Sequence, residues 1–513
     1  MNIIHAKWAR QAIFGFLDSL SGASENPRMK PCLPALLLLA ACAGPRAGSS
    51  DRLPPLQVSP SGRYLVQADG TPFLWLGDTA WGLFEKAAPE PMPDQPAVDL
   101  YFRTRAAQGF TVVQAALIFE GGRNVLGHPP FEEDRATPRV RPGPWDDFWD
   151  TADHVVDRAE AHAVRIAVLP AWAVDLPSDH PLARDPAVAY RYGRFLGERW
   201  GRRPHLIWVM GGDPYKKGTD VDNPARLAAA RATAEGIADG TNGTGTHDGQ
   251  ADWSTTLMSY HPKGGNHSSS ERLHDEPWLD FNMIQTTTCR DFANWKTVER
   301  DYRKSPPKPS FDSEVAYEAS HSLGGATKEP PLPRISPWEV RRAAYWNVLA
   351  GGFGHTYGHR SFIRWTRAGE KLKFGAETPW PEALEAPGAR QMAHLRALLL
   401  SRPFLSRIPA QDLLEGDPGA GREHVRASRA DDGSTAFVYS PSGAPFAVRL
   451  DRLSGDTLQL WWFDPRDGTA QDAGRRPRLG VQEFRPPTRG EGQDWVLVLD
   501  DAAGGFAAPG RSK

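Results

Sequence analysis

The chain has 513 residues and a formal net charge of −2, with 62 acidic and 60 basic side chains. Its length is sufficient for one large barrel and a smaller second domain. The balanced charge, without a long basic run, argues against nucleic acid as the main partner. The 18 tryptophans offer flat apolar faces on which a ligand can stack, although core packing is the commoner role of any one of them.

The N-terminal segment has the features of an export signal. An almost wholly apolar run from Leu33 to Ala41 is too short to span a bilayer but suits a signal-peptide core. The sequence Leu-Ala-Ala-Cys ending at Cys42 resembles the bacterial lipobox, so Cys42 is the predicted lipid attachment site and Met29 the predicted start. An ordinary secretory signal or an uncleaved helix are the alternatives. We expect residues 1–55 to be signal and linker, and the protein to be lipid-anchored to the bacterial envelope, or else periplasmic or secreted.

Beyond a predicted hairpin at 56–66, strands and helices alternate. The predicted strands cover 73–76, 111–117, 164–169, 205–210, 255–260, 281–286, 309–311 and 352–357. The predicted helices cover 97–108, 145–162, 186–200, 223–238, 292–302, 338–350 and 386–400, and the Gly-rich stretch 240–245 is predicted to be a flexible loop. Eight strands alternating with helices are typical of a (β/α)8 TIM barrel, here over residues 56–405. An open doubly wound sheet has the same alternation, but no Gly-rich phosphate motif follows the first strand.

The last part of the chain, residues 406–513, has a different pattern. Short alternating segments at 436–439, 446–450, 457–463 and 495–499 are separated by turn residues, which predicts a small all-β sandwich. The basic cluster Arg475–Arg478 is predicted to be a solvated loop.

Polar residues follow the predicted strands where a barrel concentrates its active site. Asp213 follows a buried strand and two glycines, and Glu314 follows the seventh strand. Two carboxylates at a barrel mouth, one protonated and one ionised, perform glycoside hydrolysis. The other strand-end residues, proposed to bind substrate, are Asp78, Trp81, Glu120, Trp172, His261, Gln285, Tyr317, His355 and Tyr357.

Each acid also has an ordinary structural interpretation. Asp213 could cap a helix, and Glu314 could be a surface acid paired with an arginine. Asp312 has the same claim as Glu314 by position, and strand alternation predicts that both share one face. The joint placement of Asp213 and Glu314 at two strand ends favours catalysis.

Other chemistries have less support. The chain has no Gly-x-Ser-x-Gly elbow. His355 and His359 have zinc-protease spacing, but Thr356 stands where the catalytic glutamate belongs and Gly358 is unfavourable to a helix. Cys289 is the single cysteine of the expected mature body, which excludes a disulfide framework and a cysteine metal site. We therefore expect no cofactor and no catalytic metal.

Five stretches resemble the apiosidase-like family of glycoside hydrolases, which includes family 140. They are 73–81 (FLWLGDTAW), 208–213 (WVMGGD), 278–285 (WLDFNMIQ), 312–318 (DSEVAYE) and 354–358 (GHTYG). They occur in the family's order over roughly 56–405, and the stretch 461–468 (WWFDPRDG) is similar to the β-module, labelled collagen-binding, that usually follows.

The resemblance implies a (β/α)8 barrel and a retaining mechanism, with Asp213 as general acid/base and Glu314 as nucleophile. Many relatives have glycine where this chain has Ser313. Serine is small enough to keep the turn, with an altered local geometry. Characterised members release apiose from a pectic glycan. We therefore expect a glycosidase that acts on plant or bacterial polysaccharide; the alternative is a non-catalytic surface protein that binds carbohydrate or matrix.

Overall fold

The computed structural model of the chain describes residues 53–173, 176–177, 179–213, 223–286, 290–322, 333–370 and 375–511. The predicted signal segment with Cys42, and also Cys289, lie outside these residues. Residues 52–513 form one unit.

Eight parallel strands form the barrel, and all eight occur where the sequence predicts them. They are β4 (Trp75–Thr79), β5 (Val112–Ala116), β6 (Arg165–Leu169), β7 (Leu206–Gly211), β8 (Met258–His261), β10 (Asn282–Gln285), β11 (Ser310–Glu314) and β12 (Gly354–Tyr357). The ladder runs β12-β4-β5-β6-β7-β8, and β10 pairs in parallel with β11. Single backbone hydrogen bonds join the two remaining seams, from Asp280 to Met258 (2.9 Å) and from Phe353 to Ser310 (3.2 Å). The barrel prediction is confirmed.

Aromatic side chains fill the lower part of the barrel. The Trp75 ring lies 5.1 Å from Phe311, 5.7 Å from Phe281 and 6.2 Å from Phe353 between ring centroids. Because this layer is packed, a substrate meets only the side chains above it, at the carboxyl ends of the strands.

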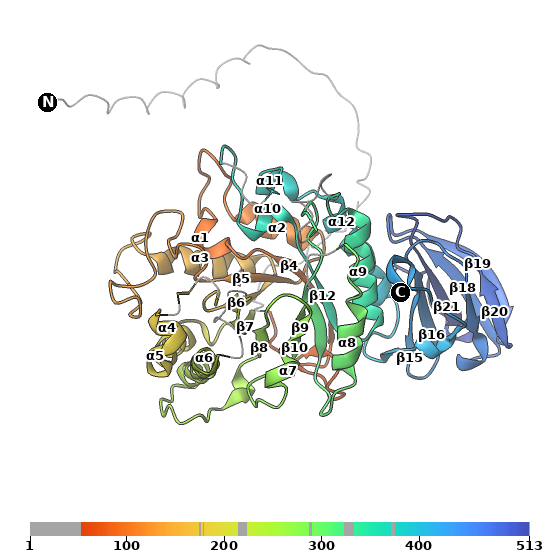
Figure 1. The fold of residues 1–513 in the computed structure, drawn as a ribbon, viewed down its shortest axis with the longest axis horizontal. Coiled ribbons are helices and arrows are strands. Elements are labelled where there is room, and N and C mark those ends of the chain that lie inside the picture. Colours follow the sequence, from red (N-terminus) through yellow and green to blue (C-terminus); the bar gives the residue numbers. More distant parts are fainter. Residues whose placement is uncertain are drawn as a thin grey trace, which may run out of the picture. The chain divides into compact units, whose positions relative to one another are not determined.

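Helices cover the outside of the barrel (Figure 1). The longer ones are α2 (Asp99–Ala107), α3 (Phe148–Ala161), α5 (Pro186–Trp200), α6 (Pro224–Asn242), α8 (Trp295–Tyr302), α9 (Pro337–Leu349) and α12 (Pro387–Leu400). Short helices α1 (Leu83–Lys86), α4 (Pro181–Arg184), α7 (Ser270–Leu273), α10 (Arg360–Ile363) and α11 (Trp380–Ala383) lie in the loops, and β9 (His267–Ser268) pairs with β10. The predicted hairpin is present as β1 (Leu56–Val58) and β2 (Leu65–Gln67), with β3 (Pro72–Phe73) added to it. Asp147, Asp185 and Asn223 cap α3, α5 and α6, as expected of these residue types.

Helix α6 corrects one sequence prediction. The helix continues through Gly240 to Asn242 and ends at Gly243, whose φ is +72°, so 240–242 is not a loop. A Cβ on Gly240 would lie 2.3 Å from the Arg194 carbonyl oxygen of α5, and one on Gly236 would lie 2.2 Å from that of Tyr190. These glycines are therefore present for close helix contact.

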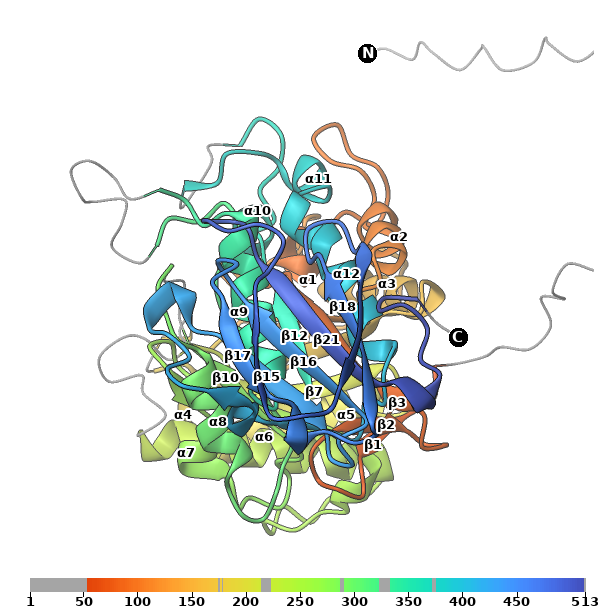
Figure 2. The same ribbon diagram turned by 90° about the vertical axis from the view of Figure 1, so that its right-hand side faces the viewer.

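The C-terminal module consists of two antiparallel sheets. One has the order β13-β15-β16-β21-β18-β19 and the other β14-β17-β20. Their bounds are β13 (Arg407–Pro409), β14 (Leu414–Glu415), β15 (Arg426–Ala430), β16 (Thr435–Ser440), β17 (Phe446–Arg449), β18 (Thr457–Phe463), β19 (Ala470–Pro477), β20 (Val481–Phe484) and β21 (Trp495–Asp501). The predicted all-β module is confirmed, but Arg475 and Arg476 lie in strand β19 rather than in a loop. Figure 2 shows β15, β16, β21 and β18 side by side.

The module packs on helix α9, which lies between it and β12 (Figure 1). Arg341 of α9 donates to both carboxylate oxygens of Asp494, at 2.9 and 2.6 Å, and both side chains are buried. Tyr345 stacks on Tyr439 at 4.8 Å, and the Trp338 indole donates to the Pro441 carbonyl at 2.9 Å. These polar and aromatic contacts fix the module on the helical side of the barrel.

Candidate active site

Asp213 stands just past the end of β7 on a strained turn. Gly211, Gly212 and Asp213 have φ of +87°, +111° and +28°. A Cβ would lie 2.5 Å from the His261 carbonyl oxygen at Gly211 and 2.9 Å from the Trp172 ring at Gly212, so this turn requires both glycines. A positive φ at a non-glycine residue is a feature that clusters at functional sites.

Glu314 ends β11 immediately after a β-bulge. Ile284 of β10 pairs with Asp312 and Gln285 pairs with Glu314, so Ser313 is the extra residue. The bulge places Asp312 on the helix side, where it accepts hydrogen bonds from Thr286 Oγ1 (2.6 Å) and Asn294 Nδ2 (3.1 Å). The prediction that Asp312 and Glu314 share a face is therefore wrong, because the extra residue reverses the alternation of the strand.

Glu314 acts electrostatically on Asp213. Burial raises the pKa of the Asp213 carboxyl above its usual range, and the negative charge of Glu314 raises it further. Hydrogen bonds from the Gly264 amide, at 2.9 Å to Oδ1, and from the Gln285 side chain lower this pKa in part. Burial and the nearby charge of Glu314 thus both favour the protonated form of the Asp213 carboxyl.

Aromatic rings and a histidine surround Glu314. His261 Nε2 lies 3.0 Å from Glu314 Oε2, and the His261 ring lies 5.2 Å from that of Trp81 and 5.3 Å from that of Trp172. Burial raises the pKa of Tyr317 well above its ordinary value, and the charge of Glu314 adds to this effect. Tyr317 thus stays a phenol beside the carboxylate. The structure brings together Asp213, Glu314, Trp81, Trp172, His261, Gln285 and Tyr317.

Three predicted substrate-binding residues lie elsewhere. Asp78 is buried against α2, where its Oδ2 accepts from Arg105 Nε at 2.6 Å and from the Tyr101 hydroxyl at 2.7 Å. Tyr357, which pairs with Asp78 across β12 and β4, donates to Glu318 at 2.6 Å. His355 lies beside Asn347 of α9, and burial lowers its pKa to about 3. Strand alternation turns all three side chains toward the helices. The prediction that they bind substrate rested only on their position at a strand end, and the structure places them outside the site.

Glu120 forms an ion pair with Arg364 at the rim. Its loop depends on a residue that sequence reasoning missed, the buried Glu85 of α1, which accepts from the amides of Phe119 (2.6 Å) and Gly122 (2.8 Å). No motif marks Glu85. The Gly264 amide was missed as well, although the pair Gly264–Gly265 after β8 is a signal for a backbone close to a functional group.

His355 and His359, which have the spacing of zinc-protease ligands, do not face either acid of the site. His359 Nδ1 accepts from the Ser361 amide at 3.1 Å and caps α10, while His355 lies beside Asn347. Within the described ranges, the one cluster with the spacing of a metal site is Asp146, Asp147 and Asp150. Asp147 is already the N-cap of α3, accepting from the amides of Trp149 and Asp150. This cluster is not part of the barrel mouth site described above.

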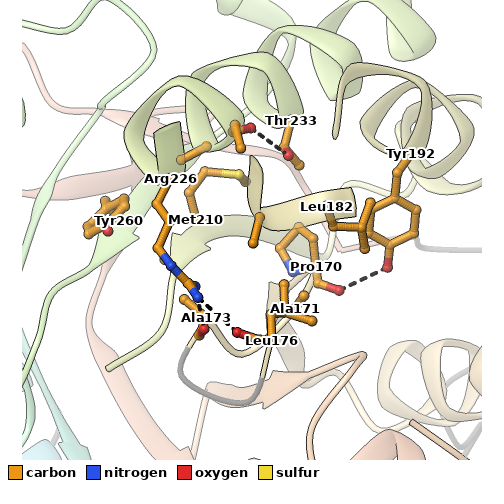
Figure 3. A pocket seen from close by; sticks show the side chains of 14 residues that line it. Pro170, Ala171, Ala173, Leu176, Leu182, Tyr192, Met210, Arg226, Thr233 and Tyr260 are labelled. Carbon is orange, nitrogen blue, oxygen red and sulfur yellow. Dashed lines mark hydrogen bonds between the residues drawn. The ribbon is translucent and has the colours of Figure 1, made fainter. Parts of the chain in front are cut away.

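An apolar pocket of about 70 Å³ lies behind the Asp213 turn (Figure 3). Met210, Leu182 and Tyr192 are among its lining, and Arg226 donates across its edge to the carbonyls of Ala173 (2.6 Å) and Leu176 (2.8 Å). Its lining includes neither Asp213 nor Glu314. The pocket is a gap between β7 and helices α4 to α6, separate from the acid pair.

The fold places the protein among the glycoside hydrolases. A solved structure described as "Glycoside hydrolase" superposes with a TM-score of 0.77 at 29% identity over 88% of this chain and 97% of its own. A glycoside hydrolase family 5 structure from Bacteroides vulgatus ATCC 8482 has the same TM-score and identity, over 88% of this chain and 94% of its own.

Within this class the chain belongs to the apiosidase-like family, as the sequence resemblance implied. The family model "Apiosidase-like, catalytic domain" matches residues 59–406. The model "Putative collagen-binding domain of a collagenase" matches residues 408–500. No curated protein sequence matches the chain significantly. Family and fold together support a glycosidase with a carbohydrate substrate.

Across the described residues, no helix combines the length and apolarity needed to cross a membrane.

Proposed function

We propose that this protein is a retaining glycosidase of the apiosidase-like kind that hydrolyses plant or bacterial polysaccharide. The observation that carries the proposal is the proximity of two acids at the ends of β7 and β11, half-buried Asp213 and buried Glu314, where the charge of Glu314 raises the pKa of Asp213. One acid that holds its proton and one that does not are what the reaction needs.

In the proposed mechanism, the Asp213 carboxylic acid gives its proton to the glycosidic oxygen as that bond breaks. The Glu314 carboxylate attacks the anomeric carbon and forms a glycosyl ester. Asp213, now ionised, takes a proton from water, which attacks the same carbon and releases Glu314. The buried Trp81 and Trp172 rings pack against each other and against His261, whose Nε2 lies 3.0 Å from Glu314, and so give the acid pair an aromatic wall.

Substitution of the two acids tests the proposal. Asp213→Asn and Glu314→Gln should each reduce the release of sugar by several orders of magnitude on a panel of pectins, apiose-bearing pectin among them, hemicelluloses and bacterial exopolysaccharides. Asp312→Asn is the matched control, since it changes an acid two residues from Glu314 that faces the helices, and it should retain activity within a few-fold.

The anomeric configuration of the first product, followed by proton NMR, tests retention. Near wild-type activity of Asp213→Asn and Glu314→Gln would refute the assignment of the acids. Binding of a glycan without release of sugar by the wild-type protein would favour the non-catalytic alternative.

We also propose that the protein is exported and anchored through Cys42. Mass spectrometry of the mature N-terminus checks this: a lipid-modified Cys42 is the expected result, and an intact Met1 peptide from exported protein would contradict it.

A further inference from the structure

A backbone amide reaches the Asp213 carboxyl from the loop after β8. The Gly264 N–H donates to Asp213 Oδ1 at 2.9 Å. A Cβ on Gly264 would lie 3.3 Å from Gln285 Nε2 and 3.5 Å from Asp213 Oδ1, so at most a methyl group fits between the loop and the acid. Glycine at this position therefore brings the main chain, rather than a side chain, against the carboxyl group.

Both ends of this loop are tied to the barrel. At its start, the His261 carbonyl accepts from the Gly212 amide at 3.1 Å, which joins the loop to the turn after β7. At its end, the Asn266 amide donates to the Thr286 carbonyl, just past β10, at 2.8 Å. The Gly264 amide is thus held in place and needs no rearrangement to reach the acid.

The direction of this hydrogen bond distinguishes the two oxygens of Asp213. A backbone N–H only donates, so Oδ1 is an acceptor in both protonation states of the carboxyl group. In a carboxylic acid the carbonyl oxygen is a stronger acceptor than the hydroxyl oxygen. The bond is therefore best satisfied when Oδ1 is the carbonyl oxygen and Oδ2 carries the hydrogen.

We propose that Gly264 is a positioning residue, whose amide keeps Asp213 Oδ1 as an acceptor and so assigns the transferred proton to Oδ2. This inference rests on the proposed role of Asp213 as general acid/base. In the first step the O–H bond at Oδ2 breaks and the glycosidic oxygen takes the proton, while the N–H at Oδ1 stabilises the negative charge left on the carboxylate. In the second step Oδ2 takes a proton from the attacking water.

NMR of the full chain labelled with 15N-glycine tests this hydrogen bond without any substrate. The Gly264 signal is assigned by its loss in Gly264→Ala. As the pH rises through the titration of Asp213, the Gly264 amide proton should move to higher frequency, because a hydrogen bond to a carboxylate is shorter and stronger than one to the neutral acid. In Asp213→Asn, whose side chain accepts but does not titrate, this movement should be absent.

A Gly264 amide proton that does not respond to pH, or that responds equally in Asp213→Asn, would overturn the proposal. Because these signals need no turnover, their outcome is independent of whether the protein proves to be a glycosidase.

Kinetics on any glycan that the wild-type protein cleaves test the consequence for proton transfer. Gly264→Pro removes the N–H, and Gly264→Ala is the matched control that keeps it. Gly264 lies outside the left-handed region and Gly265 follows it with φ of +90°. This is the pattern of a type II turn, in which proline is common at the first of the two positions.

Gly264→Pro loses one hydrogen bond to the charged form of Asp213. We expect kcat to fall roughly 10-fold and the alkaline limb of the kcat/KM profile to move to higher pH, whereas Gly264→Ala should leave that limb in place. Glu314, His261 and Gln285 also act on Asp213 and are unchanged in both variants, so the difference between the variants belongs to the amide. An alkaline limb that does not move in Gly264→Pro would overturn the proposal. Should this variant not fold, the NMR titration decides alone.

Discussion

Asp312 and Glu314 are two residues apart, yet the bulge at Ser313 gives them opposite environments. Glu314 faces His261 at the barrel mouth, whereas Asp312 is fully buried on the helix side. Burial raises the pKa of Asp312 to about 7. The folded protein therefore holds a proton between about pH 4 and pH 7 that the unfolded chain has released, so Asp312 lowers stability as the pH rises through this range.

Asp312→Asn removes this titration. We expect the variant to be more stable than wild type above pH 7, by on the order of 1–4 kcal/mol, and the difference to vanish near pH 4. Denaturant unfolding at a series of pH values measures it. Asp417→Asn, at an exposed position, is the control and should not change the pH profile. Equal stability of Asp312→Asn and wild type at pH 8 would contradict the raised pKa.

Position at a strand end located the acid pair and several of its neighbours, but it also placed three residues in the site that lie elsewhere. Asp213 and Glu314 follow buried strands, and that pattern is visible in the sequence. The direction of a side chain depends on the register and on bulges, which involve a partner strand remote in sequence. Asp78, His355 and Tyr357 were for this reason placed in the site, while the Gly264 amide, which is a backbone group, was missed.

At the scale of elements, the contact of α5 with α6 depends on glycines from both helices. Gly193 and Gly197 of α5 face the Thr233 and Ile237 carbonyls of α6, and a Cβ at either glycine would lie 2.3 and 2.2 Å from those oxygens, respectively. These contacts involve backbone atoms, which cannot move aside as a flexible side chain can. The two helices flank the pocket behind Asp213.

Gly197→Ala should separate the two helices. We expect a loss of about 1–3 kcal/mol of stability, the usual cost of overpacking, measured by denaturant unfolding. Gly121→Ala, where a Cβ meets no atom within 4 Å, is the control and should cost less. An unchanged free energy of unfolding in Gly197→Ala would show that the helices pack less closely than described.

Periodicity predicted the elements that bury an apolar face and missed those that do not. All eight barrel strands and the long helices followed from apolar patterns. Strand β19 has no such pattern, because most of its residues are exposed and it is held by pairing with β18. Gly240 gave the opposite error, since a packing glycine inside a helix has the same sequence signature as a loop.

At the scale of the whole molecule, the proposed barrel (56–405) and β-module (406–513) are joined by buried polar contacts. Besides the Arg341–Asp494 pair, Arg402 of the connecting segment donates to both oxygens of Asp500, at 2.8 and 2.7 Å. Trp295 stacks on His424 at 4.1 Å. Specific, desolvated contacts of this kind are typical of a fixed interface rather than of a freely tethered binding module.

Asp494→Ala tests whether the module and the barrel stabilise each other. The substitution leaves the Arg341 guanidinium, 3% exposed, buried without its carboxylate. Removing one partner of a buried pair costs about 3–5 kcal/mol. Calorimetry should therefore show one transition of the whole 52–513 unit at a lower Tm, rather than a shift confined to the module. Glu483→Ala breaks an exposed pair with Arg485 within the module and should cost less than about 1 kcal/mol. A separate early transition of the module, with the barrel transition unchanged, would contradict mutual stabilisation, because the barrel would then fold without support from the docked sheets.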